Sequence, residues 1–151
     1  MTAPPVPTVV GTVQLVAGLR VWAAGFPADE AAVDLFAALA QAVPSLLDPA
    51  PRPGEWWLVP CPRPGVWSLD GATLAASLDV FPTRLRPVIV VAAALAVDGA
   101  MVEVGTTLAA VPAEWLGPVF AALAHAAGYT VRPVVSGPVQ PGLFPVLDGA
   151  A

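Results

Sequence analysis

The chain has 151 residues, the length of one ordinary domain, and 57% of them are hydrophobic whereas only 11% are charged. The formal net charge is −5, there is no lysine, and the six arginines are scattered, which argues against nucleic-acid binding because phosphate backbones require clustered basic side chains. The single cysteine excludes an internal disulfide bond and a cysteine-cluster metal site. We expect one domain over residues 1–151, with a proline-rich lead-in at 1–7 and an irregular tail at 137–151.

The high hydrophobicity raises the question of a membrane span. The longest apolar run, residues 88–97, is about ten residues long, whereas a spanning helix needs roughly 20. The first residues lack the charged start, apolar middle and cleavage site of a signal peptide. The sequence therefore predicts a soluble protein of the cytoplasm or of an assembled particle, without a membrane span.

The first predicted elements are a hairpin and a helix. VVGTVQLVAGLRVWAAG, residues 9–25, has the pattern of two strands around Ala17-Gly18. Pro27 and the acidic pair Asp29-Glu30 are helix-start signals, and Pro44 is expected to end this helix near Val43.

A repeated motif follows in PRPGEWWLVPCPRPGVWSL, residues 51–69, which contains Pro-Arg-Pro-Gly-x-Trp twice. Pro-Gly suits the central positions of a type II turn, so each copy is expected to begin a strand. We predict a three-stranded meander over residues 55–79, although residues 71–79 are also compatible with a short helix. With residues 61–65 as the loop, Val59 faces Trp67, which places Trp57 and Trp67 on one face and Trp56 on the other.

A second hairpin is predicted over residues 86–111, because Asp98-Gly99 separates two β-rich runs. In that register Glu103 lies opposite Ala94 on a face of small residues. A carboxylate there could orient a ligand or lie at a subunit contact, and the alternative is a solvated charge on the wet side of the sheet.

The last predicted helix covers residues 113–127, with Gly128 at the position of a left-handed C-cap and Pro118 in the first turn or at a break. Alanines rather than charged residues cover its outer face, which favours subunit packing; an alanine-rich composition is the alternative. His125 lies away from its apolar stripe. A final strand is expected at residues 129–135.

These elements predict an α+β domain: an antiparallel sheet of hairpins and a meander, with two helices packed on one side. Hairpin, helix and strand recur over residues 8–60 and 87–136, and FAALAQAV (36–43) matches FAALAHAA (120–127). An internal ββαβ duplication is therefore a hypothesis, with chance similarity between alanine-rich segments as its alternative.

Enzymatic chemistry finds little support in the sequence. His125 is the only histidine, and there is no phosphate-binding loop, nucleophile-elbow or zinc-protease motif. We expect no catalytic residue, no cofactor and no metal site. The candidate residues for a ligand site or an interface are Glu103, Trp56, Trp57, Trp67, Arg52, Arg63, Glu55 and His125.

The order of elements and the string VAGLRVWAAGFPADEAAVDLF, residues 16–36, resemble the GyrI-like small-molecule-binding domains. The resemblance implies a twice-repeated strand–helix–strand plan with a ligand cleft between the repeats. It also implies an acidic residue on the last strand, but the corresponding stretch here, VQPGLFPVL at 139–147, carries none. Tryptophans with Glu103 or Glu55 would then line the cleft.

Two functions follow from the sequence. The preferred one is a non-enzymatic structural protein, a subunit of a homo-oligomeric or particle-like assembly such as a phage particle. It associates with copies of itself or with other protein subunits, which would bury its excess apolar surface. The alternative is a small-molecule-binding domain resembling the GyrI-like modules.

Overall fold

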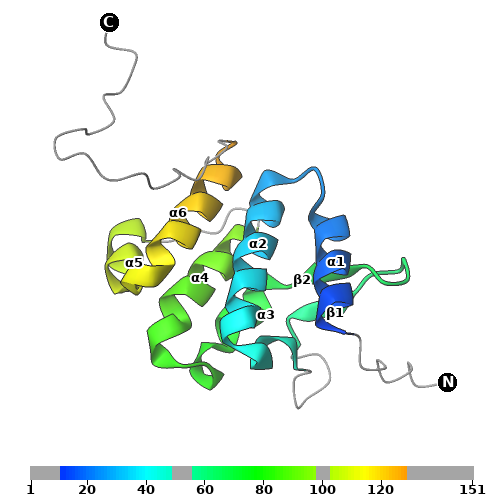
Figure 1. Cartoon of the computed structure of the whole chain (residues 1–151), viewed down its shortest axis with the longest axis horizontal. Helices are drawn as coiled ribbons and strands as arrows, with labels where there is room; N and C mark the ends of the chain where they lie inside the picture. The colour runs from blue at the N-terminus through cyan, green and yellow to red at the C-terminus, as the bar shows by residue number, and fades with distance from the viewer. Residues whose placement is uncertain (1–10, 49–55, 98–102, 129–151) are drawn as a thin grey trace, which may run out of the picture.

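The computed structural model describes residues 11–48, 56–97 and 103–128, and within these ranges the chain is mostly helical (Figure 1). The two strands that it contains form one antiparallel ribbon. The elements in chain order are α1 (Thr12–Ala23), α2 (Pro27–Ala42), η1 (Pro44–Leu47), β1 (Leu58–Pro60), β2 (Trp67–Leu69), α3 (Gly71–Ala76), η2 (Leu78–Val80), η3 (Thr83–Leu85), α4 (Arg86–Leu95), α5 (Val104–Ala110) and α6 (Ala113–Ala126).

The predicted α+β sheet of hairpins and a meander is therefore wrong. The hairpin expected over residues 9–25 is occupied by helix α1. Its buried residues include Leu15, Leu19 and Ala23, which are four positions apart and so lie on one face of a helix. Gly18, predicted to lie in a turn, is instead a buried position in the middle of this helix.

The hairpin expected over residues 86–111 is also wrong, because residues 86–95 and 104–110 form helices α4 and α5. The β-branched run from Val88 to Val91 suggested a strand. Helix α4 packs against α2, α3, α5 and α6, so apolar residues occupy most of its circumference and the usual helical alternation is lost. The proposed turn Asp98-Gly99 lies outside the described residues.

The two predicted helices are confirmed as α2 and α6. Helix α2 begins at Pro27, has Asp29 and Glu30 in its first turn, and ends just before Val43 and Pro44. These acids face the positive end of the helix dipole, and a residue that precedes proline disfavours helical backbone. Helix α6 ends before Gly128, whose φ of +86° is the left-handed conformation expected after a helix.

Pro118 lies inside α6, beyond its first turn, and the helix continues through it. A proline there removes one backbone donor from the helical ladder. The preceding residue is Gly117, which has no Cβ to clash with the proline ring and therefore tolerates helical backbone at that position. The sequence Gly-Pro thus allows a proline within an unbroken helix.

Helix α2 is the central element, because it packs against α1, α4 and α6 (Figure 1). Phe36 and Leu39 of α2 are fully buried in the hydrophobic core, as is Ile89 of α4. The matching segments 36–43 and 120–127 lie on α2 and α6, which contact each other. The hypothesis of a ββαβ duplication is wrong for the described residues, since helices occupy the hairpins of both units.

The antiparallel pairing of strands β1 and β2 is confirmed, but its register is shifted by one residue. Trp67 pairs with Pro60, and Val59 pairs with Ser68 rather than with Trp67. In the connecting loop the backbone amide of Val66 donates to the carbonyl of Arg63 over 3.2 Å, and Gly65 has φ of +77°. This agrees with a type II turn centred on Pro64-Gly65. The other copy of the motif lies mostly outside the described residues.

The third strand of the predicted meander does not form, because residues 71–76 are helix α3 and residues 78–80 are η2. The N-cap of α3 is Asp70, whose carboxylate accepts from the Thr73 backbone amide over 3.1 Å and from the Thr73 hydroxyl over 2.7 Å. Of the alternatives that the sequence left open for 71–79, the helix is correct.

None of the helices in the described ranges combines the length and the apolar character needed to cross a bilayer.

Candidate functional site

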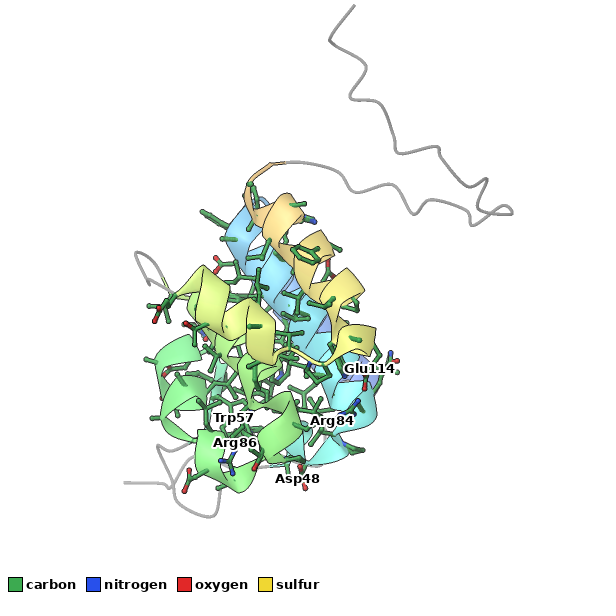
Figure 2. The ribbon with its side chains drawn as sticks, turned by 90° about the vertical axis from the view of Figure 1, so that its left-hand side faces the viewer. Asp48, Trp57, Arg84, Arg86 and Glu114 are labelled. Carbon is green, nitrogen blue, oxygen red and sulfur yellow. The ribbon has the colours of Figure 1, made fainter. Side chains whose placement is uncertain are left out.

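The predicted tryptophans meet around the β ribbon, and Trp57 is anchored in the core. Its indole Nε1 donates to the carbonyl oxygen of Leu46 over 2.7 Å, and its ring packs edge-on against Phe81 with the centroids 5.3 Å apart. Figure 2 shows Trp57 among the side chains of the interior. Because its polar atom is satisfied and its ring is buried, Trp57 is a structural residue and not a ligand contact.

Trp56 and Trp67 are in contact, which corrects their predicted placement on opposite faces. Their ring centroids are 5.5 Å apart at an interplanar angle of 67°. The one-residue shift in strand register explains the difference, since such a shift moves a side chain to the other face. Trp56 is half-buried, and its Nε1 is buried with no hydrogen-bond partner among the described residues. Trp67 is buried but borders a surface groove.

This groove lies between helix α1 and the β1–β2 loop, and we call it the α1–loop groove. It has a volume of about 500 Å³. Its lining residues are Gln14, Ala17, Gly18 and Val21 from α1, and Arg63, Pro64, Gly65, Val66 and Trp67 from the ribbon. Trp67 forms its apolar wall on the ribbon side, and Val21, half of whose surface is exposed, forms the wall on the α1 side.

Gly18 determines how closely helix α1 and the β1–β2 loop can approach each other. A Cβ atom at this position would lie 2.2 Å from the carbonyl oxygen of Gly65 and 2.8 Å from Cδ1 of Trp67. Both distances are shorter than any ordinary contact, so only glycine lets the helix approach the loop this closely. Gly18 therefore positions the turn that carries Arg63.

The groove has one charged residue, Arg63, and one amide side chain, Gln14. No acidic residue is among the described residues that line it, and no hydrogen bond or ion pair joins the Arg63 guanidinium to another described residue. A cation beside an apolar wall is suited to an anionic group attached to an apolar one.

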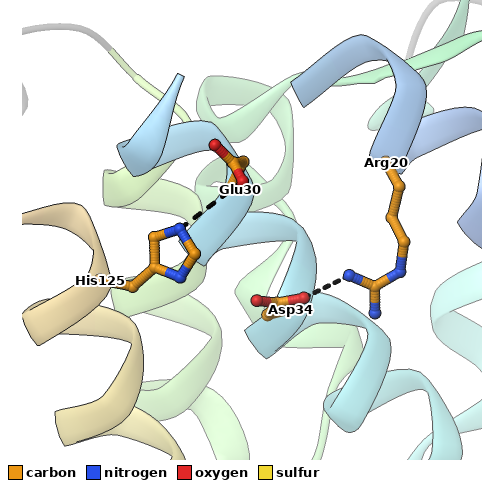
Figure 3. Close-up of polar contacts among 4 residues, drawn as sticks. All are labelled: Arg20, Glu30, Asp34 and His125. Carbon is orange, nitrogen blue, oxygen red and sulfur yellow. Dashed lines mark hydrogen bonds and ion pairs between the residues drawn. The ribbon is translucent and has the colours of Figure 1, made fainter. Parts of the chain in front are cut away.

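A separate polar strip crosses the surface of α1, α2 and α6 (Figure 3). Arg20 of α1 forms an ion pair with Asp34 of α2, and Nε2 of His125 lies 3.7 Å from a carboxylate oxygen of Glu30. Arg20, Glu30 and Asp34 also line a pocket of about 200 Å³. Since Arg20 and His125 each already face a carboxylate and are partly exposed, this strip is best described as surface polar contacts between helices.

His125, expected at a ligand site or an interface, thus points toward Glu30 of the same chain (Figure 3). Glu103 is exposed at the N-cap of α5, not on a sheet face opposite Ala94. Arg52 and Glu55 lie outside the described residues. Of the predicted candidates, the structure brings together Trp67 and Arg63 in the groove and Trp56 behind Trp67.

Helix α6 also has an exposed apolar surface, formed by Gly117, Phe120 and Ala121, which we call the α6 face. Phe120 is 53% exposed. The alanines expected on the outside of this helix are divided, because Ala122 is buried in the core while Ala121 is exposed. An ion pair between Glu114 of α6 and Arg84 of η3 lies at the start of this helix (Figure 2).

Comparison with protein-family models, with curated proteins and with solved structures finds no match to this chain. The repeated strand–helix–strand plan of the GyrI-like domains is also absent from the described residues. In the same ranges no three His, Cys, Asp or Glu side chains are grouped so that they could hold a metal ion. Sequence reasoning missed Gln14, Gly18 and Val21 as groove residues, because they were assigned to a hairpin.

Proposed function

We propose that the protein is a non-enzymatic structural subunit of a homo-oligomeric assembly, which associates with copies of itself through the α6 face. The observation that carries this proposal is the exposure of Phe120 on a helix with very few charges. Only Glu114 and His125 among residues 113–126 are ionisable. Exposed apolar surface with so little charge is typical of protein interfaces.

The shape of the α6 face supports a second copy of the chain as the partner. Phe120 is a large side chain, whereas Gly117 and Ala121 beside it are small. A two-fold symmetric contact pairs the same surface on both subunits, so it can place Phe120 of each subunit over the small residues of the other. Aromatic side chains at the centre of such contacts contribute most of the binding free energy.

The test is the oligomeric state by size-exclusion chromatography with light scattering. We expect the unaltered chain to have at least twice the 15.3 kDa mass of one chain. Phe120→Asp should weaken association about 30-fold, because central aromatic residues contribute about 2 kcal/mol or more.

The control is Val13→Asp, which puts the same charge on an 82% exposed valine of α1, across the molecule from α5 and α6 (Figure 1). This variant should retain the mass of the unaltered chain. A chain that is monomeric at tens of micromolar, or a Phe120→Asp variant that associates as strongly as Val13→Asp, would contradict the proposal.

A further inference from the structure

The α1–loop groove contains a cation with no acidic partner among the described residues, next to an exposed valine of α1 and the edge of the largely buried Trp67. Arg63 is exposed on the turn of the β ribbon. Val21, half of whose surface is exposed, lines the groove on the α1 side. An occupant that complements this surface needs an apolar stretch with a single acidic residue beside it.

We propose that the α1–loop groove is the docking site of residues 143–148 of this same chain, Leu-Phe-Pro-Val-Leu-Asp, with Asp148 paired to Arg63. The segment lies outside the described residues, and it is chosen for its chemistry. Asp148 is the only acidic residue in 129–151, and four apolar side chains and one proline precede it directly. The proline-rich stretch at 1–7 contains no acid and cannot pair with Arg63.

Proline-containing extended segments bind well to grooves with aromatic walls, because their backbone loses little conformational freedom on binding. In the α1–loop groove the aromatic wall is Trp67, and Phe144 is the largest apolar side chain of the segment. Because Arg63 lies at the solvent edge, its pairing with Asp148 sets the direction of the segment more than its affinity.

The end of α6 is close enough for the segment to reach the groove. His125 of α6 lies 3.7 Å from Glu30, and Glu30 lines the same small pocket as Arg20, which is adjacent in sequence to the groove residue Val21. Fourteen residues, 129–142, connect Gly128 to the segment and can extend over at most about 46–50 Å. Helix α1, with 12 residues, is only about 18 Å long.

The experiment uses the full chain with the photoreactive residue p-benzoylphenylalanine in place of Phe144, irradiated at low micromolar concentration. The products are separated by mass, and the linked peptides are identified by mass spectrometry. We expect crosslinks at the mass of a single chain, from position 144 to residues 12–23 or 61–67. Arg63→Glu should lower their yield about two- to fivefold, because an exposed ion pair contributes no more than about one tenfold step in an equilibrium.

The matched variants separate charge pairing from other effects. Asp148→Arg should lower the yield as Arg63→Glu does, and the two changes together should restore it. Arg84→Glu, which alters another exposed arginine far from the groove in sequence, should leave it unchanged. Crosslinks to other helices, crosslinks only at the mass of two chains, or a yield insensitive to Arg63→Glu would each overturn the proposal. A crosslink within one chain does not require self-association, so the outcome is independent of the proposed assembly.

Discussion

Replacing Gly18 with alanine tests whether the close contact between α1 and the β1–β2 loop is as tight as the structure indicates. The added Cβ would lie 2.2 Å from the carbonyl oxygen of Gly65. Since ordinary contacts between such atoms need about 3.5 Å, the helix and the loop must separate by more than about 1 Å. The loop backbone cannot rotate away as a flexible side chain could, so the strain extends to Trp67, which the same Cβ would approach to 2.8 Å.

The magnitude follows from two opposing contributions. Overpacking of this kind costs about 1–3 kcal/mol of the free energy of unfolding. Replacing glycine by alanine within a helix returns up to about 1 kcal/mol, because alanine loses less backbone freedom on folding. Gly105→Ala in α5 is the control, since it gains the second contribution and a Cβ there would have no atom within 4 Å. The difference between the two variants isolates the clash and should be about 1–3 kcal/mol.

The assay is urea unfolding of both variants, followed by tryptophan fluorescence. Gly18→Ala should unfold at a lower urea concentration than the unaltered chain or near it, and Gly105→Ala at the same concentration or a higher one. Thermal midpoints should differ by roughly 3 °C for each kcal/mol in a chain of this length. Equal stability of Gly18→Ala and Gly105→Ala would show that the loop is not held against α1, and the reasoning about the groove would fail with it.

Two further predictions concern side chains whose hydrogen bonds the structure defines. Trp57→Phe should lower the free energy of unfolding by about 1–3 kcal/mol, because the buried carbonyl of Leu46 loses its donor. Trp56→Phe removes an indole N–H that has no partner among the described residues and should cost less, so a larger loss for Trp56→Phe in urea unfolding would contradict this. Asp70→Ala should cost about 0.5–2 kcal/mol through loss of the cap on Thr73, and Asp70→Asn should retain most of that stability, so equal losses measured by thermal unfolding would count against the cap.

The helices that could be predicted from sequence are those with signals at their ends. Pro27 with the acids of the first turn marks the start of α2, and Pro44 marks its end. Gly128 marks the end of α6, and its positive φ confirms that it adopts the left-handed conformation that follows a helix. These signals depend on local backbone sterics and dipoles, which the sequence displays without knowledge of the rest of the fold.

The helices that could not be predicted lack such signals or are surrounded by other elements. Helix α4 has no acidic residue in its first turn and begins with Arg86-Pro87, and its ten residues pack against several elements, so their apolar run shows no helical period. In α1 the glycine in mid-helix resembled a turn residue. Its actual role is to permit a backbone contact with a loop about 47 residues later in the chain, and no local pattern encodes such a contact.

The candidate site was predictable only in part, because one of its sides has a local sequence signal and the other does not. The repeated Pro-Arg-Pro-Gly-x-Trp motif indicated a turn with an arginine and a strand with a tryptophan, and in its second copy Arg63 and Trp67 do lie on one side of the groove. The other side comes from α1, whose helical state had to be known first. The motif thus forms one side of the α1–loop groove, and Gly18 is the residue that lets the other side approach it.

The close approach of Trp67 to Gly18 also connects the groove to the core of the protein. Trp67 is only 7% exposed, its ring contacts Trp56, and its strand pairs with β1 beside the anchored Trp57. An occupant of the groove therefore rests on a wall that the core holds rigid, and it does not have to order that wall on binding. A rigid wall lowers the entropic cost of docking, so a short segment with one ion pair and a few apolar side chains can bind there. This holds if the segment belongs to the same chain, because its effective concentration at the groove is then high.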